Sequence, residues 1–275
     1  MIKAFQLEWL KIRNYKVFWI LLGLYLLALV IISSFGVFFL EWLKAQGADF
    51  EGIDPTIIPI YDFPDIWQNT TYLASFLKVL LAFIVIISVN NDQSYLTLRQ
   101  NVIDGISKKE FLMSKLMLIV FLALTSACFL FLAGLINGSI YSHVQGVTYI
   151  FSELEFLAAY CYDIIVYCTL AFLLTLLIKK TGFVIIVLFL YTMMFEPILA
   201  AVFEFNNYFE GSLWEAMVPY FPIKSLNNLI PVPFPRYFFQ EIVDDVPMNA
   251  VAISTVWLSF YLGSIYFLLS RRDLK

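Results

Sequence analysis

Long runs of apolar residues divide the chain, and shorter polar intervals separate them. Each run is long enough to cross a hydrocarbon core of ~30 Å as a helix, and lipid cannot satisfy unpaired backbone groups. The runs lack the apolar/polar alternation of a membrane barrel. The pattern therefore predicts six transmembrane helices, over Val17–Leu40, Tyr72–Val89, Leu116–Ile136, Phe156–Ile178, Phe183–Phe203 and Val251–Leu269.

Residues 1–16 have a different pattern, in which apolar side chains recur on one helix face and lysines lie on the other. Such a helix lies in the headgroup plane of a membrane, with its basic side toward anionic lipid. We therefore expect an interfacial helix here, with membrane lipid as a partner. Its apolar face consists of Ile2, Phe5, Trp9 and Ile12.

The polar interval at residues 90–115 separates the second and third predicted spans. Within it, Tyr95, Leu98 and Val102 fall at i, i+3 and i+7, which places them on one face of a helix. The spacing predicts a short amphipathic helix over Tyr95–Ile103 rather than an unstructured linker.

A break and a second helix follow that short helix. Asp104-Gly105 ends it, because glycine accepts the left-handed conformation that a helix C-terminus often needs. Ser107, with Glu110 three residues later, has the pattern of a capping box, in which side chains satisfy the free amides of a new helix. We expect this second helix to continue through Lys115 into the third span.

Composition agrees with a membrane protein. The 275 residues are 61% hydrophobic and 14% charged, whereas soluble domains are about 25% charged. Mean hydropathy is +0.84. The three cysteines lie inside predicted spans without CxxC spacing, which argues against a structural zinc site or a disulfide framework. The fold class we expect is an all-α integral membrane protein, with residues 1–275 as a single transmembrane domain.

The distribution of lysine and arginine predicts the orientation. With the N-terminus inside, the inner segments carry thirteen of the seventeen basic residues and the outer segments carry three. Cytoplasmic loops are enriched in these residues. Both termini are therefore expected in the cytoplasm, and the membrane is expected to be a bacterial inner (plasma) membrane.

The outer segment 204–250 combines six prolines with many apolar and aromatic residues. Prolines at this density forbid one long helix, and so much apolar surface disfavours a free aqueous loop. We expect short helices that lie on the outer membrane face or re-enter it, between spans five and six.

Three ionisable residues lie inside predicted spans: Lys78, Asp163 and Glu196. Counted from the outer ends at ~1.5 Å per residue, all three lie about 9–10 Å deep. Charged residues inside a membrane are costly and are functional candidates by default. Pairing or snorkelling of Lys78 is one interpretation, and a role in substrate binding or gating is the other.

The segment TLRQNVIDGISKKEFLMSK resembles the cytoplasmic coupling segment of type-2 ABC-transporter permeases, although an ordinary solvated loop between spans is the alternative. Asp92 stands where that family usually carries a glutamate. The residues that match the family's pattern are Thr97, Leu98, Arg99, Gly105, Ser107 and Lys115.

The resemblance implies a permease subunit of an ABC exporter. It implies two copies of the permease, as a homodimer or with a paralogue, and two cytoplasmic ATPase subunits that bind ATP-Mg. It also implies a coupling helix that docks on the ATPase. The docking residues would be Tyr95, Leu98, Arg99, Val102, Ile103, Gly105 and Ser107.

Motifs narrow the function classes. G-x-x-x-x-G-K-[ST] does not occur, so this chain has no Walker loop for ATP phosphates, and H-E-x-x-H does not occur either. We expect no catalytic residues, no cofactor, no metal and no nucleic-acid partner for this chain. Two alternatives remain: an ion-coupled secondary transporter that uses Lys78, Asp163 and Glu196, and a non-transporting envelope scaffold. The substrate is not specified by the sequence.

Overall fold

The computed structural model describes residues 2–46, 59–94, 107–144, 146–206, 208–239 and 245–271. These residues form helices and turns, and no strand occurs among them. Five helical stretches of the described chain are long and apolar enough to cross a membrane, and a bent pair of helices adds up to one more. The structure therefore agrees with an all-helical membrane protein.

In chain order, the helical elements are α1 (Ile2–Arg13), α2 (Lys16–Ala45), α3 (Ile66–Ser75), α4 (Lys78–Ser94), α6 (Lys108–Tyr141), α7 (Val147–Ile150), α8 (Glu155–Ile178), α9 (Thr181–Leu190), a π-helical turn (Tyr191–Phe195), α10 (Glu196–Phe205), α11 (Leu213–Met217), a 3-10 turn (Val218–Tyr220), α12 (Pro222–Asn227), α13 (Pro235–Phe239) and α14 (Met248–Arg271).

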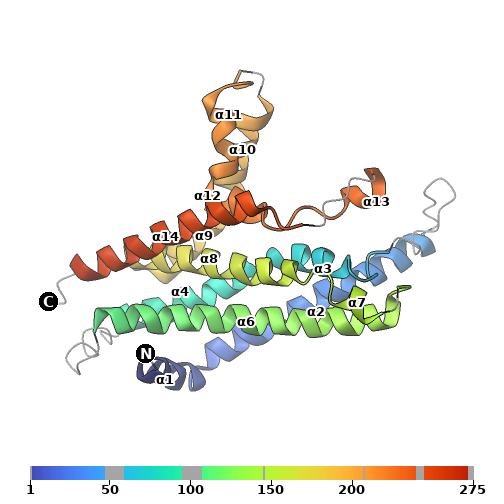
Figure 1. The fold of residues 1–275 in the computed structure, drawn as a ribbon. Coiled ribbons are helices and arrows are strands. Elements are labelled where there is room, and N and C mark those ends of the chain that lie inside the picture. The colour runs from blue at the N-terminus through green and yellow to red at the C-terminus, as the bar shows by residue number, and fades with distance from the viewer. Residues whose placement is uncertain are drawn as a thin grey trace.

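Helix α8 is the centre of the bundle. It contacts α3, α4, α6, α9 and α14, and the long helices run along a common direction in Figure 1. Its sequence is apolar all round, which is typical of a helix surrounded by others. Large side chains such as Phe156, Tyr160 and Phe172 are fully buried there.

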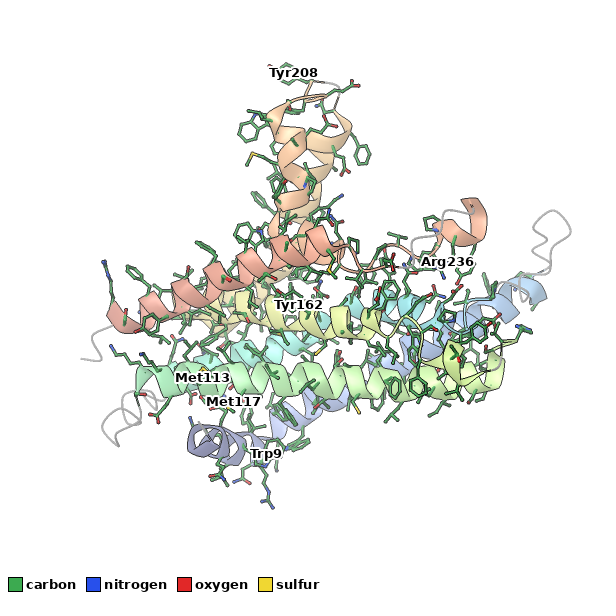
Figure 2. All side chains as sticks on the ribbon, in the orientation of Figure 1. Trp9, Met113, Met117, Tyr162, Tyr208 and Arg236 are labelled. Atoms are coloured by element: carbon green, nitrogen blue, oxygen red, sulfur yellow. The ribbon has the colours of Figure 1, made fainter. Side chains whose placement is uncertain are left out.

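Helix α1 lies outside the bundle and contacts α6 near the N- and C-termini of the chain (Figure 1). The ring of Trp9 packs edge-on against Phe121, with 5.4 Å between ring centroids. Figure 2 shows Trp9 beside the half of α6 that carries Met113 and Met117. The predicted N-terminal helix is thus confirmed, while its contact with lipid stays a prediction.

The second predicted span is not one straight helix. Instead, α3 and α4 meet at an angle of 46° with a break at Phe76–Leu77. The hydroxyls of Thr70 and Thr71 donate to the carbonyls four residues earlier, at 2.6 Å each. Such back-bonding often bends helices, and the apolar pattern alone did not reveal it.

Helix α3 lies closely against α6 at the end of the bundle opposite the termini. A side chain on Gly134 would bring its Cβ within 2.6 Å of the Trp67 ring, and Gly138 faces Phe63 in the same way. Helices in lipid associate largely through close van der Waals contact, which small residues permit. These two glycines therefore set how closely α3 approaches α6.

The fifth span leaves the bundle part-way along. Helix α9 packs on α4 and α8, and the chain continues through the π-helical turn into α10, with Pro197 in the first turn of α10. Helices α10 and α11 then project away from the bundle (Figure 1). Tyr208 is at the tip of this arm (Figure 2).

Segment 204–250 contains the short helices that its prolines predict. Helix α12 packs against α14, and the Trp257 indole donates to the Tyr220 carbonyl at 2.9 Å. Whether these helices lie on a membrane or re-enter it stays a prediction.

Residues 231–239 are fastened to the start of α3. Arg236 pairs with Asp65 at 2.5 Å, and the Asn69 amide donates to the Tyr237 hydroxyl at 2.7 Å. Burial raises the pKa of Tyr237 to about 12, so its hydroxyl stays protonated and able to donate well above neutral pH.

Candidate functional site

Lys115 of α6 is the centre of a buried charge cluster. Its ammonium contacts the carboxylate of Glu8, lies 2.6 Å from Asp92 Oδ2 and donates to Ser88 Oγ at 2.8 Å. The side chain is 1% exposed. The ammonium also donates to the Ser88 carbonyl at 3.3 Å, so it is surrounded by oxygen atoms from α1 and α4.

Lys11 completes the cluster from its outer side. Its ammonium lies 2.9 Å from Asp92 Oδ1 and 3.8 Å from Glu8 Oε2, and 36% of its side chain is exposed. Two lysines thus face two carboxylates, so the cluster is neutral overall. Buried charges are tolerated only when they are paired in this way. We call Glu8, Lys11, Asp92 and Lys115 the elbow cluster.

Helical spacing brings these side chains together. Glu8 and Lys11 lie three residues apart on α1, and Ser88 and Asp92 lie four apart on α4, so each pair shares one helix face. Glu8 also accepts a hydrogen bond from Ser88 Oγ at 2.9 Å. The elbow cluster therefore connects α1, α4 and α6 through charged groups.

The elbow cluster lies close to both ends of the segment expected to couple to an ATPase. Asp92 is two residues before the end of α4, and Lys115 is two helical turns after the start of α6. The docking candidates Tyr95, Leu98, Arg99, Val102, Ile103 and Gly105 lie outside the described residues.

Ser107 has the predicted capping role. Its hydroxyl accepts from the Glu110 amide at 3.2 Å, and its own amide donates to Glu110 Oε2 at 2.8 Å. This reciprocal capping box starts α6 at Lys108. The start of the helix that carries Lys115 is therefore confirmed, whereas docking of Ser107 on an ATPase stays a prediction.

Lys78 and Asp163 form a second buried site, in the middle of the bundle. The ammonium lies 2.8 and 3.0 Å from the two carboxylate oxygens, and both side chains are almost fully buried. The Tyr167 ring lies 5.4 Å from the ammonium. The ion pair that the equal depths suggest is present, and snorkelling of Lys78 is excluded.

Glu196 has different partners. Its carboxylate accepts from the amides of Ile223 and Lys224, at 2.6 and 2.8 Å, at the first turn of α12. Although Glu196 has the same predicted depth as Lys78, no hydrogen bond or ion pair between the two is present among the described residues. Glu196 joins α10 to α12 because free amides at a helix start attract a carboxylate.

The sequence did not predict the role of Glu8 in the elbow cluster, nor a buried set of three hydroxyls. Glu8 is outside the apolar face that defines α1 as interfacial, although its spacing from Lys11 places the two on a common face. The hydroxyls of Tyr25, Ser126 and Tyr160 also form a buried hydrogen-bonded triangle between α2, α6 and α8. No local motif predicts this triangle, because its members are far apart in the chain.

That this chain binds no metal stays a prediction, and the side chains in the described part of the chain do not contradict it. No group of three or more His, Cys, Asp or Glu side chains is placed there to hold a metal ion. His143 instead pairs with Asp62 at 3.2 Å.

Comparison with known proteins gives the family. A family model described as "ABC-2 family transporter protein" matches residues 4–195, which is well over half of the 275 residues. The match includes all four residues of the elbow cluster. The search of curated proteins found no match. The chain therefore belongs to the ABC-2 family of transporter membrane proteins.

Proposed function

We propose that this chain is the membrane-spanning permease subunit of an ATP-driven exporter. In this proposal two copies, or this chain and a paralogue, bind two cytoplasmic ATPase subunits that hold ATP-Mg. Residues 95–103 form the coupling helix, and both chain termini lie in the cytoplasm.

The elbow cluster is the observation that supports this proposal best. It ties together the interfacial helix α1, the end of α4 and the first turns of α6. A force applied to residues 95–106 acts on the last two of these elements. Because buried ion pairs hold the three helices together, they move as one unit and pass the displacement to the bundle.

The ion-coupled alternative has less support. A secondary transporter needs a carboxylate that can take up and release its ion at the substrate site. Asp163 is closed by Lys78, and one oxygen of Glu196 accepts two backbone amides. Both carboxylates therefore have structural partners. No described feature favours a non-transporting scaffold.

The test is co-purification of the chain with its ATPase. Tyr95→Ala/Arg99→Ala is expected to weaken the complex by about tenfold or more, because aromatic and arginine anchors dominate helix-in-groove interfaces. Membrane insertion should be unchanged, since neither residue lies in a span. Gly105→Val is expected to retain the ATPase yet uncouple hydrolysis from export, since a β-branched residue disfavours a left-handed turn.

A matched control is Lys179→Ala/Lys180→Ala, at the other cytoplasmic turn. If this control loses the ATPase while Tyr95→Ala/Arg99→Ala keeps it, docking occurs at the Lys179–Lys180 turn instead. A stable monomer that transports without any ATPase would overturn the proposal as a whole.

A further inference from the structure

A groove lies beside the elbow cluster, between α1, α2 and α4. Its volume is about 420 Å³, within the range of roughly 300–1,000 Å³ that is usual for small-molecule sites. The groove borders the cluster and is separate from the Lys78–Asp163 pair.

The two parts of the groove differ in chemistry. One wall is apolar and is formed by Ile12, Phe18, Leu21, Ile84 and Ile87. The other part is polar and is formed by Ser88, Asn91 and the four residues of the elbow cluster. A ligand that fills both parts needs an apolar chain joined to a polar head. The groove thus has the lining of a site for an amphiphile.

The charges around the groove indicate which charge the headgroup of the amphiphile carries. Within the elbow cluster two lysines balance two carboxylates, so the cluster itself has no net charge. Arg13 and Lys16 do not line the groove, but both are exposed and each directly follows a lining residue, Ile12 and Tyr15, so two further positive charges lie near it. Three basic residues within six positions favour an anionic headgroup.

The surroundings identify the source of the amphiphile. Apolar side chains on the same stretch are largely exposed, namely Leu10, Val17, Trp19 and Ile20. In a membrane protein such a surface faces lipid, and a helix with basic and apolar sides lies at the headgroup level. The groove therefore opens where acyl chains and headgroups meet.

We propose that this groove binds one anionic membrane lipid, with an acyl chain along Phe18, Leu21 and Ile87 and the phosphate at Lys11, Arg13 and Lys16. This binding does not depend on an ATPase or on a cargo, so it goes beyond the proposed function. A bound lipid fills the space between α1 and α4 and so holds the elbow cluster closed.

The first arm of the test uses native mass spectrometry of the purified chain with phosphatidylglycerol or phosphatidylcholine of identical chains. One phosphatidylglycerol is expected to be retained with about twenty-five-fold preference, since each of the two exposed basic residues, Arg13 and Lys16, adds about fivefold near an anionic lipid. Ile87→Trp fills the groove and should abolish this preference. Leu124→Trp, on an exposed face of α6, is the matched control and should retain it.

The second arm tests the headgroup. Arg13→Gln/Lys16→Gln leaves the elbow cluster intact and should lower phosphatidylglycerol retention to that of phosphatidylcholine. Lys179→Gln/Lys180→Gln removes two exposed charges elsewhere and should have no effect. Inorganic phosphate should not displace the lipid, because it lacks the chain.

Thermal unfolding establishes that each variant is folded, and Leu21→Trp replaces Ile87→Trp if the latter is not. Equal retention of both lipids, displacement by phosphate, or unchanged retention in the folded groove-filling variant overturns the proposal. The proposal is also overturned if the monomer retains the lipid and the assembled dimer does not, because a second copy of the chain would then cover the groove.

Discussion

Lys78 and Lys115 are both buried lysines in the same helical bundle, but they meet carboxylates in different ways. Lys78 faces one carboxylate, Asp163, in a closed pair between α4 and α8. Lys115 faces Glu8 and Asp92 and also contacts Ser88, and Asp92 in turn contacts Lys11. One site joins two helices, and the other joins three.

The two sites therefore differ in which helices they can move together. A closed pair in the bundle centre fixes the relative position of two helices, and among the described residues no hydrogen bond or ion pair joins it to a third helix. The elbow cluster connects a helix outside the bundle to the two helix ends that flank residues 95–106. We infer that the Lys78–Asp163 pair stabilises the bundle, while the elbow cluster links the bundle to α1 and to the helix ends that flank residues 95–106.

The largest effect is expected from Lys115→Met. This change leaves two buried carboxylates facing each other, with only the partly exposed Lys11 to balance them. Removing one partner of a buried pair typically costs about 3–5 kcal/mol, and two stranded carboxylates place this variant at the upper end. Thermal unfolding of the purified chain in detergent measures it.

The rescue variant for this site is Glu8→Gln/Asp92→Asn/Lys115→Met. It should recover most of the stability, because neutral groups need no counter-charge. Coupling of ATP hydrolysis to transport should stay lost, because the links between α1, α4 and α6 are gone. Recovery of both properties would remove the distinction between the two sites.

Lys78→Met should have the next largest effect. Stranding Asp163 is expected to cost about 3 kcal/mol, at the lower end of the same range. Adding Asp163→Asn should restore stability and, in contrast to the elbow cluster, should also restore coupling. If Lys78→Met/Asp163→Asn is stable yet inactive, the pair has a role in transport itself and the comparison fails.

The smallest effect is expected from Lys11→Gln. Its side chain is 36% exposed, and partly solvated ion pairs contribute about 0.2–1 kcal/mol. The unfolding midpoint should therefore hardly move at physiological salt, and Lys16→Gln provides a matched exposed lysine. A loss as large as that of Lys115→Met would show that Lys11, rather than Lys115, holds the cluster together.

Much of this fold follows from local signals in the sequence. Apolar runs predict the spanning helices, and the Ser107–Glu110 spacing predicts the start of α6 because a capping box needs only four neighbouring residues. The prolines of segment 204–250 predict short helices there. Equal depth predicts the pair of Lys78 with Asp163, because membrane helices put depth and residue number in direct proportion.

The rest depends on how helices are placed side by side, which one sequence does not encode locally. The bend between α3 and α4 and the departure of α10 from the bundle leave no signal in the apolar pattern. Glu8 meets Lys115 across 107 residues, and nothing near either residue predicts the contact. For the same reason the sequence does not show that Glu196 meets the amides of α12.

One further consequence follows from the length of α6. It has 34 residues and is therefore ~51 Å long, against a hydrocarbon thickness of ~30 Å. It contains no proline, and it carries Lys115 near one end and Gly134 near the other, ~28 Å apart. Such a helix behaves as a stiff lever. If it tilted about its middle, the end held by Lys115 and the end under Trp67 would move in opposite directions.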